Sequence, residues 1–242
     1  MLIRAITFDF WGTLYHGASA KPLRMKRLSD VLRANGYDFS LETLDVAERV
    51  AWNAWDRVWR EECRTLPSGE WLRLMLDHLR VTLPPAEVEA LAAYFGEAVF
   101  DIEPPLKMVD GMADTVQRLS ERYRLGLISD TGLSSGKVLR YFLGRDGVLG
   151  CFACLSFSDE AGVSKPHPDA FLRTLRCLGA QPSEATHIGD LTRTDIAGAK
   201  AVGMRVVRFT GSNDDADRST EADAVVGTYA DFEALIREWG SG

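Results

Sequence analysis

The sequence predicts an α/β protein, built on a parallel sheet that is interrupted by an inserted bundle of helices. Short apolar runs alternate with amphipathic helical segments over residues 105–239, which is typical of βαβ units. Residues 17–102, by contrast, place their apolar positions only at helical spacing. We therefore expect two domains: an α/β core of residues 1–16 and 103–242, and a helical insert of residues 17–102.

The first predicted strand ends at Asp9. Within the stretch from Arg4 to Leu14, the run that leads to Asp9 contains β-branched and aromatic residues and is apolar on both faces, as expected of a strand that is covered on both sides. In open α/β sheets, ligands bind at the carboxyl ends of the strands, and Asp9 stands at such an end. Gly12 lets the backbone turn away sharply. Asp9 is thus a candidate functional carboxylate, although an aspartate that only caps a loop fits this segment equally well.

Four amphipathic helices are predicted in the insert, at residues 22–35, 40–63, 68–79 and 84–100. Ser40 is expected to cap the second of them. Three tryptophans of that helix, Trp52, Trp55 and Trp59, lie close together, and we interpret them as bundle packing because aromatic stripes are usually buried. The loop of residues 64–69 is expected to influence substrate choice. The four helices together predict a bundle.

The rest of the chain alternates between strands and helices. Helices are predicted at residues 113–122, 134–143, 169–178, 195–201 and 229–239. Strands are predicted at residues 125–128, 151–157, 185–188, 205–209 and 224–226. His187 falls inside one of these strands and is interpreted as a core histidine. This order of elements predicts a single parallel sheet.

Composition excludes several classes of function. The net charge of −7 and the absence of a basic run argue against a partner that is a nucleic acid or an anionic membrane. No window of 18 uncharged apolar residues is present, and Arg4 and Asp9 interrupt any signal-peptide core, so we expect a cytoplasmic protein. Cys151 and Cys154 lie in an apolar run and are interpreted as buried free thiols rather than as a zinc or redox site.

Candidate functional groups follow four predicted strands: Asp9, Ser129 with Asp130, Lys165, and Asp190 with Asp195. Carboxylates, a hydroxyl and a lysine at one edge of a sheet suit phosphoryl transfer. Asp9 and Asp190 would supply oxygen ligands to Mg²⁺, and Lys165 would neutralise phosphate charge so that Asp9 can attack phosphorus. Ser129 would donate a hydrogen bond to a phosphoryl oxygen.

These residues resemble the four motifs of the haloacid dehalogenase-like (HAD) hydrolase superfamily. The motifs are Asp9-x-x-Gly12-Thr13, strand-terminal Ser129, Lys165-Pro166-x-Pro168, and Gly189-Asp190 with Asp195. The resemblance covers about residues 1–15 and 105–235, and the helical insert matches the superfamily's cap in position. It implies a Rossmann-like core of five strands, in which the first strand is central and is flanked by the strands of Ser129 and Asp190.

The resemblance also implies roles for single residues. Asp9 would be the nucleophile, while Ser129 and Lys165 would hold the phosphate. Thr13 and Asp130 are assigned to substrate binding on the same basis. The metal ligands would be Asp9, Asp190, the main-chain carbonyl of Trp11 and, directly or through water, Asp195.

One position departs from the pattern of family phosphatases. Where they carry a second aspartate as general acid and base, this chain has Trp11, which cannot transfer protons. Asp130 or His16 could take over that role, but no spacing singles out either one.

We therefore expect a Mg²⁺-dependent phosphatase of a small phosphorylated metabolite. The alternatives are a metal-independent 2-haloacid dehalogenase and a HAD-fold protein with little or no catalysis. The oligomeric state stays open.

Overall fold

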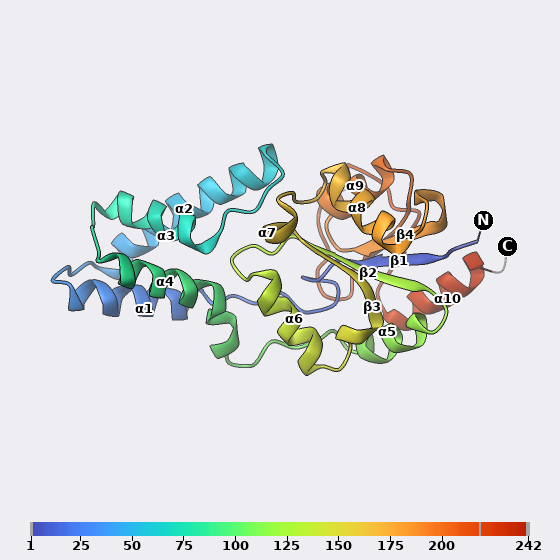
Figure 1. Ribbon diagram of the computed structural model, residues 1–242, viewed down its shortest axis with the longest axis horizontal. Coiled ribbons are helices and arrows are strands. Elements are labelled where there is room, and N and C mark those ends of the chain that lie inside the picture. The colour runs from blue at the N-terminus through green and yellow to red at the C-terminus, as the bar shows by residue number, and fades with distance from the viewer. Residues whose placement is uncertain (1, 218, 241–242) are drawn as a thin grey trace.

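The computed structural model describes residues 2–217 and 219–240. Figure 1 shows a twisted sheet flanked by helices and, beside its carboxyl edge, a separate group of helices. The sheet and its flanking helices are formed by both ends of the chain, and the separate group by the segment between β1 and α5. Among the described residues, no helix is both long enough and apolar enough to cross a membrane.

Over the described residues the sheet has six strands, all parallel, in the order β3-β2-β1-β4-β5-β6. They are β1 (Ala5–Phe8), β2 (Arg124–Ser129), β3 (Phe152–Phe157), β4 (Ala185–Gly189), β5 (Arg205–Phe209) and β6 (Ala224–Val226). The predicted α/β fold is confirmed, with β1 between the strands that carry Ser129 and Asp190. The short edge strand β6 is the sixth strand, one more than the resemblance implied.

Helices cover both faces of this sheet (Figure 1). One face packs against α5 (Met112–Ser120), α6 (Gly136–Arg145) and α10 (Tyr229–Gly240). The other packs against α8 (Pro168–Leu178) and α9 (Ala197–Ala201). Every residue of β1 is buried because apolar side chains meet it from both sides, as its sequence predicts.

Short turns of helix complete the fold. A single turn, α7 (Ser158–Ala161), follows β3, and 3₁₀ turns lie at Ala98–Asp101, Leu149–Cys151 and Pro182–Glu184. After β4 the chain forms a π-helical turn, Thr192–Ile196, before α9 begins. The sequence predicted a regular helix from residue 195, so the start of that helix is corrected.

The four inserted helices are α1 (Lys21–Ala34), α2 (Leu41–Glu61), α3 (Ser68–Leu79) and α4 (Pro85–Glu97). Ser40 caps α2 as predicted, its hydroxyl accepting a hydrogen bond from the Thr43 amide at 3.1 Å. The helices share an apolar core of their own, which includes the fully buried Leu72 and Phe95. Such a core gives the insert a separate source of stability.

The loop between α2 and α3 contacts the α/β part of the molecule. The amide of Ser164 donates to the carbonyl of Cys63 at 2.6 Å. Thr65 is buried and its hydroxyl lies within hydrogen-bonding distance of the hydroxyls of Ser158 and Ser164. The loop of residues 64–69, which we expected to influence substrate choice, is therefore a contact between the insert and the segment that precedes Lys165.

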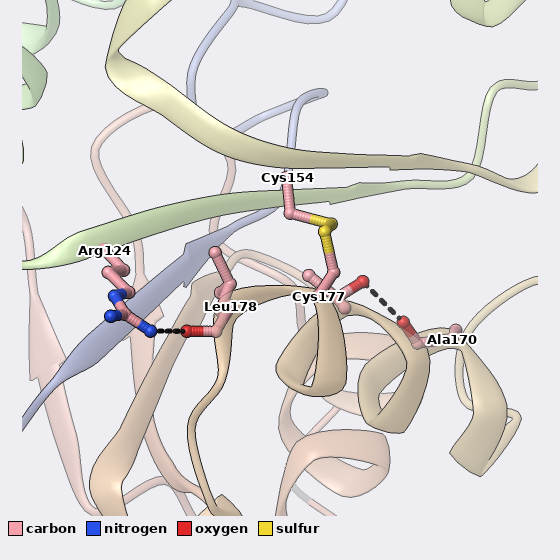
Figure 2. The surroundings of a disulfide bond; sticks show 6 residues. Arg124, Cys154, Ala170, Cys177 and Leu178 are labelled. Atoms are coloured by element: carbon pink, nitrogen blue, oxygen red, sulfur yellow. Dashed lines mark hydrogen bonds between the residues drawn. A yellow bond between two sulfur atoms is a disulfide. The ribbon is translucent and has the colours of Figure 1, made fainter.

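A disulfide joins β3 to α8. Figure 2 shows Cys154 reaching down from the strand to Cys177 near the end of the helix, next to the hydrogen bond from Arg124 to the Leu178 carbonyl. Cys63 and Cys151 are free. The interpretation of Cys154 as a free thiol is thus wrong, because its partner comes from a helix 23 residues further on.

Replacing Cys177 with Ser is expected to lower the free energy of unfolding by about 2–4 kcal/mol in the absence of a reducing agent, because the disulfide restricts the unfolded chain. Urea unfolding with and without dithiothreitol measures the effect, and the reductant should destabilise the wild type while leaving Cys177→Ser unchanged. Cys151→Ser, which removes a free thiol, is the matched control. Equal stabilities of the wild type and Cys177→Ser without reductant would contradict the prediction.

Candidate active site

Three carboxylates meet at the carboxyl edge of the sheet. Asp9 follows β1 and Asp190 follows β4, and these strands are neighbours with Phe8 paired to Ile188. Asp195 comes from the π-helical turn after β4, where its carboxylate accepts a hydrogen bond from the Leu191 amide at 3.0 Å. One oxygen from each of the three lies within 4.8 Å of the others, and all three residues are buried.

Two glycines make this close approach possible. Gly12 has a φ of +74°, and a Cβ atom on it would overlap the carboxylate of Asp190. A Cβ atom on Gly189 would overlap the side chain of Asp195. Both positions need glycine because a side chain would push a carboxylate out of the cluster.

Lys165 lies between two of the carboxylates. Its ammonium Nζ donates to Asp9 Oδ1 and to Asp195 Oδ1, each at 2.5 Å, and its side chain is 2% exposed. Burial opposes the charged form, but the carboxylates of Asp195 and Asp9 raise the pKa of Lys165 above its usual range. Lys165 thus stays protonated, and it joins Asp9, the candidate nucleophile after β1, to Asp195 in the π-helical turn.

The cluster carries more negative than positive charge. Burial, together with the charges of Asp195 and Asp190, raises the pKa of Asp9 well above its usual value, although Lys165 opposes the shift. Burial and Asp195 raise the pKa of Asp190 to about 7. Burial acts against the ionised form of Asp195 as well, but Lys165 lowers its pKa below the usual value. Buried carboxylate oxygens that Lys165 alone does not neutralise are suited to bind a hard divalent cation.

Two hydroxyls of the predicted site are buried without a hydrogen-bond partner in the part of the chain that the structure describes. Ser129, at the end of β2, and Thr13 are both buried, and neither side-chain oxygen has a hydrogen-bond partner among the described residues. A buried hydroxyl without a partner costs free energy, so such groups are candidates for ligand contacts.

A cavity of about 380 Å³ opens above the carboxylates. Of the predicted site residues, six line it: Asp9, Trp11, Asp130, Lys165, Asp190 and Asp195. Thr13 and Ser129 lie outside this lining. The insert contributes Arg24 and four tryptophans, namely Trp52, Trp55, Trp59 and Trp71. The interpretation of the α2 tryptophans as bundle packing is therefore incomplete. Trp55 packs against the bundle core, but Trp52, Trp55 and Trp59 all line the cavity as well.

Asp130 joins the insert to the α/β core. Its Oδ2 accepts a hydrogen bond from the indole N–H of Trp59 at 2.8 Å, and its Oδ1 accepts one from the Lys165 amide at 2.9 Å. The guanidinium of Arg193 lies 4.0 Å from the ring centroid of Trp59. The other residue considered as an acid, His16, has its Nδ1 2.9 Å from the Ser212 hydroxyl. Both carboxylate oxygens of Asp130 thus already have donors from the protein.

Two further side chains support the carboxylates. His187 is buried, with Nδ1 2.9 Å from Thr7 Oγ1 and Nε2 3.2 Å from Asp195 Oδ1. Asn213 donates from Nδ2 to Asp190 Oδ2 at 2.7 Å. The sequence indicated a buried histidine but not its contact with Asp195, and nothing in the polar loop around Asn213 pointed to the site.

The raised pKa of Asp190 predicts how stability depends on pH when no metal is bound. A carboxyl group whose pKa is raised by folding binds its proton more tightly in the native state. The contribution of Asp190 to the free energy of unfolding is then fully present below the pKa of 3.8 in the unfolded chain, and it is lost as the pH rises toward the folded pKa of about 7. Asp190→Asn removes this charge, so we expect the variant to be more stable than the wild type at pH 7 by on the order of 1–3 kcal/mol.

Urea unfolding in EDTA across this pH range measures the effect. The control is Asp169→Asn, a half-exposed carboxylate on α8 that is paired with Arg173 outside the cavity. A variant at Asp190 that is less stable than the wild type at pH 7 would contradict the prediction.

Comparisons with known proteins show which family this chain is similar to. A family model of the haloacid dehalogenase-like hydrolases matches residues 3–203. The chain is 29% identical to a glyceraldehyde 3-phosphate phosphatase of Methanopyrus kandleri, covering 86% of this chain and 84% of that protein. It is 27% identical to a ribulose-1,5-bisphosphate 5-phosphatase of Halopiger xanaduensis, covering 96% and 98%.

Solved structures show the same fold. A 2-haloacid dehalogenase from Pseudomonas syringae pv. Tomato superposes with a TM-score of 0.74 at 22% identity, covering 98% of this chain and 100% of that one. A HAD phosphatase from Thermococcus onnurineus superposes with a TM-score of 0.64 at 25% identity, covering 97% and 98%. With the family match over most of its length, the chain belongs to the haloacid dehalogenase-like hydrolases.

Proposed function

We propose that the protein is a Mg²⁺-dependent phosphatase that hydrolyses small phosphate monoesters through an aspartyl phosphate at Asp9. The observation that carries the proposal is the meeting of Asp9, Asp190 and Asp195 in one buried cluster, in which Asp9 and Asp195 also bind the ammonium of Lys165. The names of relatives that cover most of the chain, which are phosphatases of glyceraldehyde 3-phosphate and ribulose 1,5-bisphosphate, support the same reaction class.

Asp9 is the nucleophile in this proposal. Its carboxylate lines the cavity, and an oxygen of it forms a bond to phosphorus while the bond from phosphorus to the leaving-group oxygen breaks. Water then hydrolyses the acyl phosphate and restores Asp9. Lys165 keeps its positive charge next to Asp9 and attracts the phosphoryl oxygens, and the hydroxyls of Ser129 and Thr13 are free to donate hydrogen bonds to them.

Asp9, Asp190, Asp195 and the main-chain carbonyl of Trp11 would hold the metal ion. A donor set of carboxylate and carbonyl oxygens suits Mg²⁺. When bound, the ion would neutralise charge on the phosphoryl group. His187 orients Asp195 and Asn213 orients Asp190, so that both carboxylates keep their positions.

The helical insert, residues 17–102, acts as a cap in this proposal. It covers the carboxylates with its tryptophans and contacts the core through Trp59 and Asp130. The connections near residues 16–20 and 101–106 are the two crossings between the parts and would serve as hinges. A closed cap excludes water from the site while Asp9 reacts.

The second candidate is a metal-independent 2-haloacid dehalogenase, in which Asp9 attacks carbon. Trp11 favours it, because dehalogenases of the family also lack the acid at that position. The three carboxylates favour the phosphatase, because a site that works without a cation has no use for Asp190 facing Asp9. The similarity to a solved dehalogenase, at 22% identity, concerns the fold.

Phosphate and halide release test the two candidates directly. We expect release of phosphate from p-nitrophenyl phosphate and from members of a panel of phosphate monoesters, with loss of activity in EDTA and recovery with Mg²⁺. Halide release from 2-chloropropionate should be absent. Halide release that is indifferent to EDTA, without phosphate release, would replace the phosphatase by the dehalogenase, and inactivity on both panels would favour the non-catalytic alternative.

A further inference from the structure

We infer that the leaving group of the substrate is a flat aromatic ring system that carries an anionic group at the end remote from the scissile phosphate. The ring would lie against the tryptophans of the cavity, and the anionic group would meet Arg24. This inference rests on the proposed phosphatase function and adds the class of substrate.

The tryptophans form a continuous aromatic wall. Trp59, Trp55 and Trp52 follow one another along α2, with stacked ring centroids 5.2 and 5.0 Å apart and planes inclined by 25° and 24°. Trp71 on α3 meets Trp52 edge to face at 5.6 Å. Five of the six tryptophans of the chain line this one cavity, Trp11 being the fifth.

This wall is only partly covered by protein. Trp52 keeps 50% of its surface exposed, which is costly for so large an apolar side chain when it borders a cavity. Indole rings bind flat conjugated ligands by offset stacking and edge-to-face contact. A cavity of about 380 Å³ is also within the usual range for a site that encloses a ring-sized ligand.

The wall leads away from the reacting carboxylate. Trp59 stands at the near end, because its indole N–H is bonded to Asp130, whose other oxygen binds the Lys165 amide. Trp52 stands at the far end of the stack, and it lines a neighbouring pocket together with Arg24, which also lines the cavity. A phosphate held at Asp9 would therefore direct its leaving group along the stacked rings toward Arg24.

Arg24 brings a positive charge to that end. Its Nε donates to the Phe95 carbonyl at 2.8 Å, which fixes the side chain. Within the described parts of the chain it forms no ion pair, and Glu48, which acts on it electrostatically, is bound by Lys21 at 3.1 Å. Burial lowers the pKa of Arg24 to about 10, so the guanidinium remains charged at neutral pH. A fixed guanidinium in an apolar lining suits a carboxylate or a second phosphate.

A small polar substrate would fit this lining poorly. A three-carbon phosphate, such as the one named for the Methanopyrus relative, has no ring to place against the tryptophans and would leave them in contact with water. The wall therefore distinguishes this chain's expected substrate from that of the relative.

Pairs of phosphate esters with the same leaving-group acidity test the inference. In the first pair, 3-phenylpropyl phosphate is compared with n-hexyl phosphate, since both leave as primary alcohols and differ in the ring. In the second pair, 3-(4-carboxyphenyl)propyl phosphate is compared with 3-phenylpropyl phosphate. We expect kcat/KM to be about 5- to 100-fold higher for the aromatic member, and higher again by about tenfold for the carboxylate.

Variants assign each preference to its residue. Trp52→Leu should reduce the preference in the first pair, and Arg24→Met the preference in the second. The matched control is Val50→Ala, which changes an exposed residue of the same helix outside the cavity lining and should keep both ratios. The ratios within each pair cancel any loss of folded enzyme, so a poorly folding variant still gives a result.

The outcomes separate this inference from the proposed function. Hydrolysis of all esters with kcat/KM within threefold in either pair would overturn the inference and leave the phosphatase standing. Failure to hydrolyse any ester, including p-nitrophenyl phosphate, would remove the proposed function and with it the inference. A preference in the wild type that persists in Trp52→Leu and Arg24→Met would also contradict it.

Discussion

Asp9→Asn is expected to lower kcat for any phosphate ester by about 10⁴-fold or more, with the protein remaining folded. The amide is a far weaker nucleophile than a carboxylate, so the first covalent step is lost. No other carboxylate replaces it, since Asp195 is held by Lys165 and His187, and Asp190 by Asn213.

The same variant should keep its free energy of unfolding within about 1 kcal/mol of the wild type in the absence of metal. Two effects oppose each other there. Lys165 loses one of its two ionic partners, while burial and the repulsion that raise the pKa of Asp9 are relieved. Phosphate release and urea unfolding measure the two quantities, with Asp169→Asn as the surface control. A kcat within tenfold of the wild type would remove Asp9 as the nucleophile.

The second large effect concerns Trp11 and the acidity of the leaving group. Trp11 lines the cavity beside Asp9 and has no proton to give. Asp130 accepts N–H donors at both oxygens, and His16 is bonded to Ser212. Leaving groups must then depart nearly unaided, so kcat/KM should fall steeply as the pKa of the leaving alcohol rises. Acyl and aryl phosphates should react well and simple alkyl phosphates poorly.

Trp11→Asp should flatten this dependence. General acid–base assistance is typically worth ~10²–10⁴ in rate, and alkyl phosphates should gain the most from it, up to that range. The gain depends on placement of the new carboxyl group, and the loss of Trp11 from its contact with Phe10 costs packing. The test is to measure kcat/KM for the wild type and for Trp11→Asp over a series of phosphate esters whose leaving groups differ in pKa. A shallow dependence in the wild type would mean that Asp130 or His16 supplies the proton.

Most of the fold and the gathering of the candidate site residues at one edge of the sheet could be predicted from the sequence because they depend on local patterns. Asp9, Ser129 and Asp190 each end a buried apolar run, and parallel strands bring their carboxyl ends to one edge. The order of strands followed from the family resemblance and from the alternation of strand and helix. The prediction that these strand-end residues meet Lys165 therefore needed no knowledge of distant contacts.

The features that were missed depend on contacts between distant segments. The spacing of Trp52, Trp55 and Trp59 shows that they share a face of a helix, but the cavity on that face is formed partly by the α/β core. Cys154 and Cys177 meet only because α8 packs against β3. Asn213 reaches Asp190 from a polar loop without periodicity, where the sequence carries no signal of its direction.

The gathering of tryptophans around one cavity gives the protein a built-in optical signal. Trp239 on α10 is the one tryptophan of the chain that stands apart from the cavity, so ultraviolet emission will come mostly from the rings beside Asp9. Trp59 lies under Arg193 and is bonded to Asp130, so any separation of the helical insert from the core must change the surroundings of that indole. Opening of the cap and the arrival of a ligand can thus be followed by intrinsic fluorescence in stopped-flow experiments, without attaching a dye.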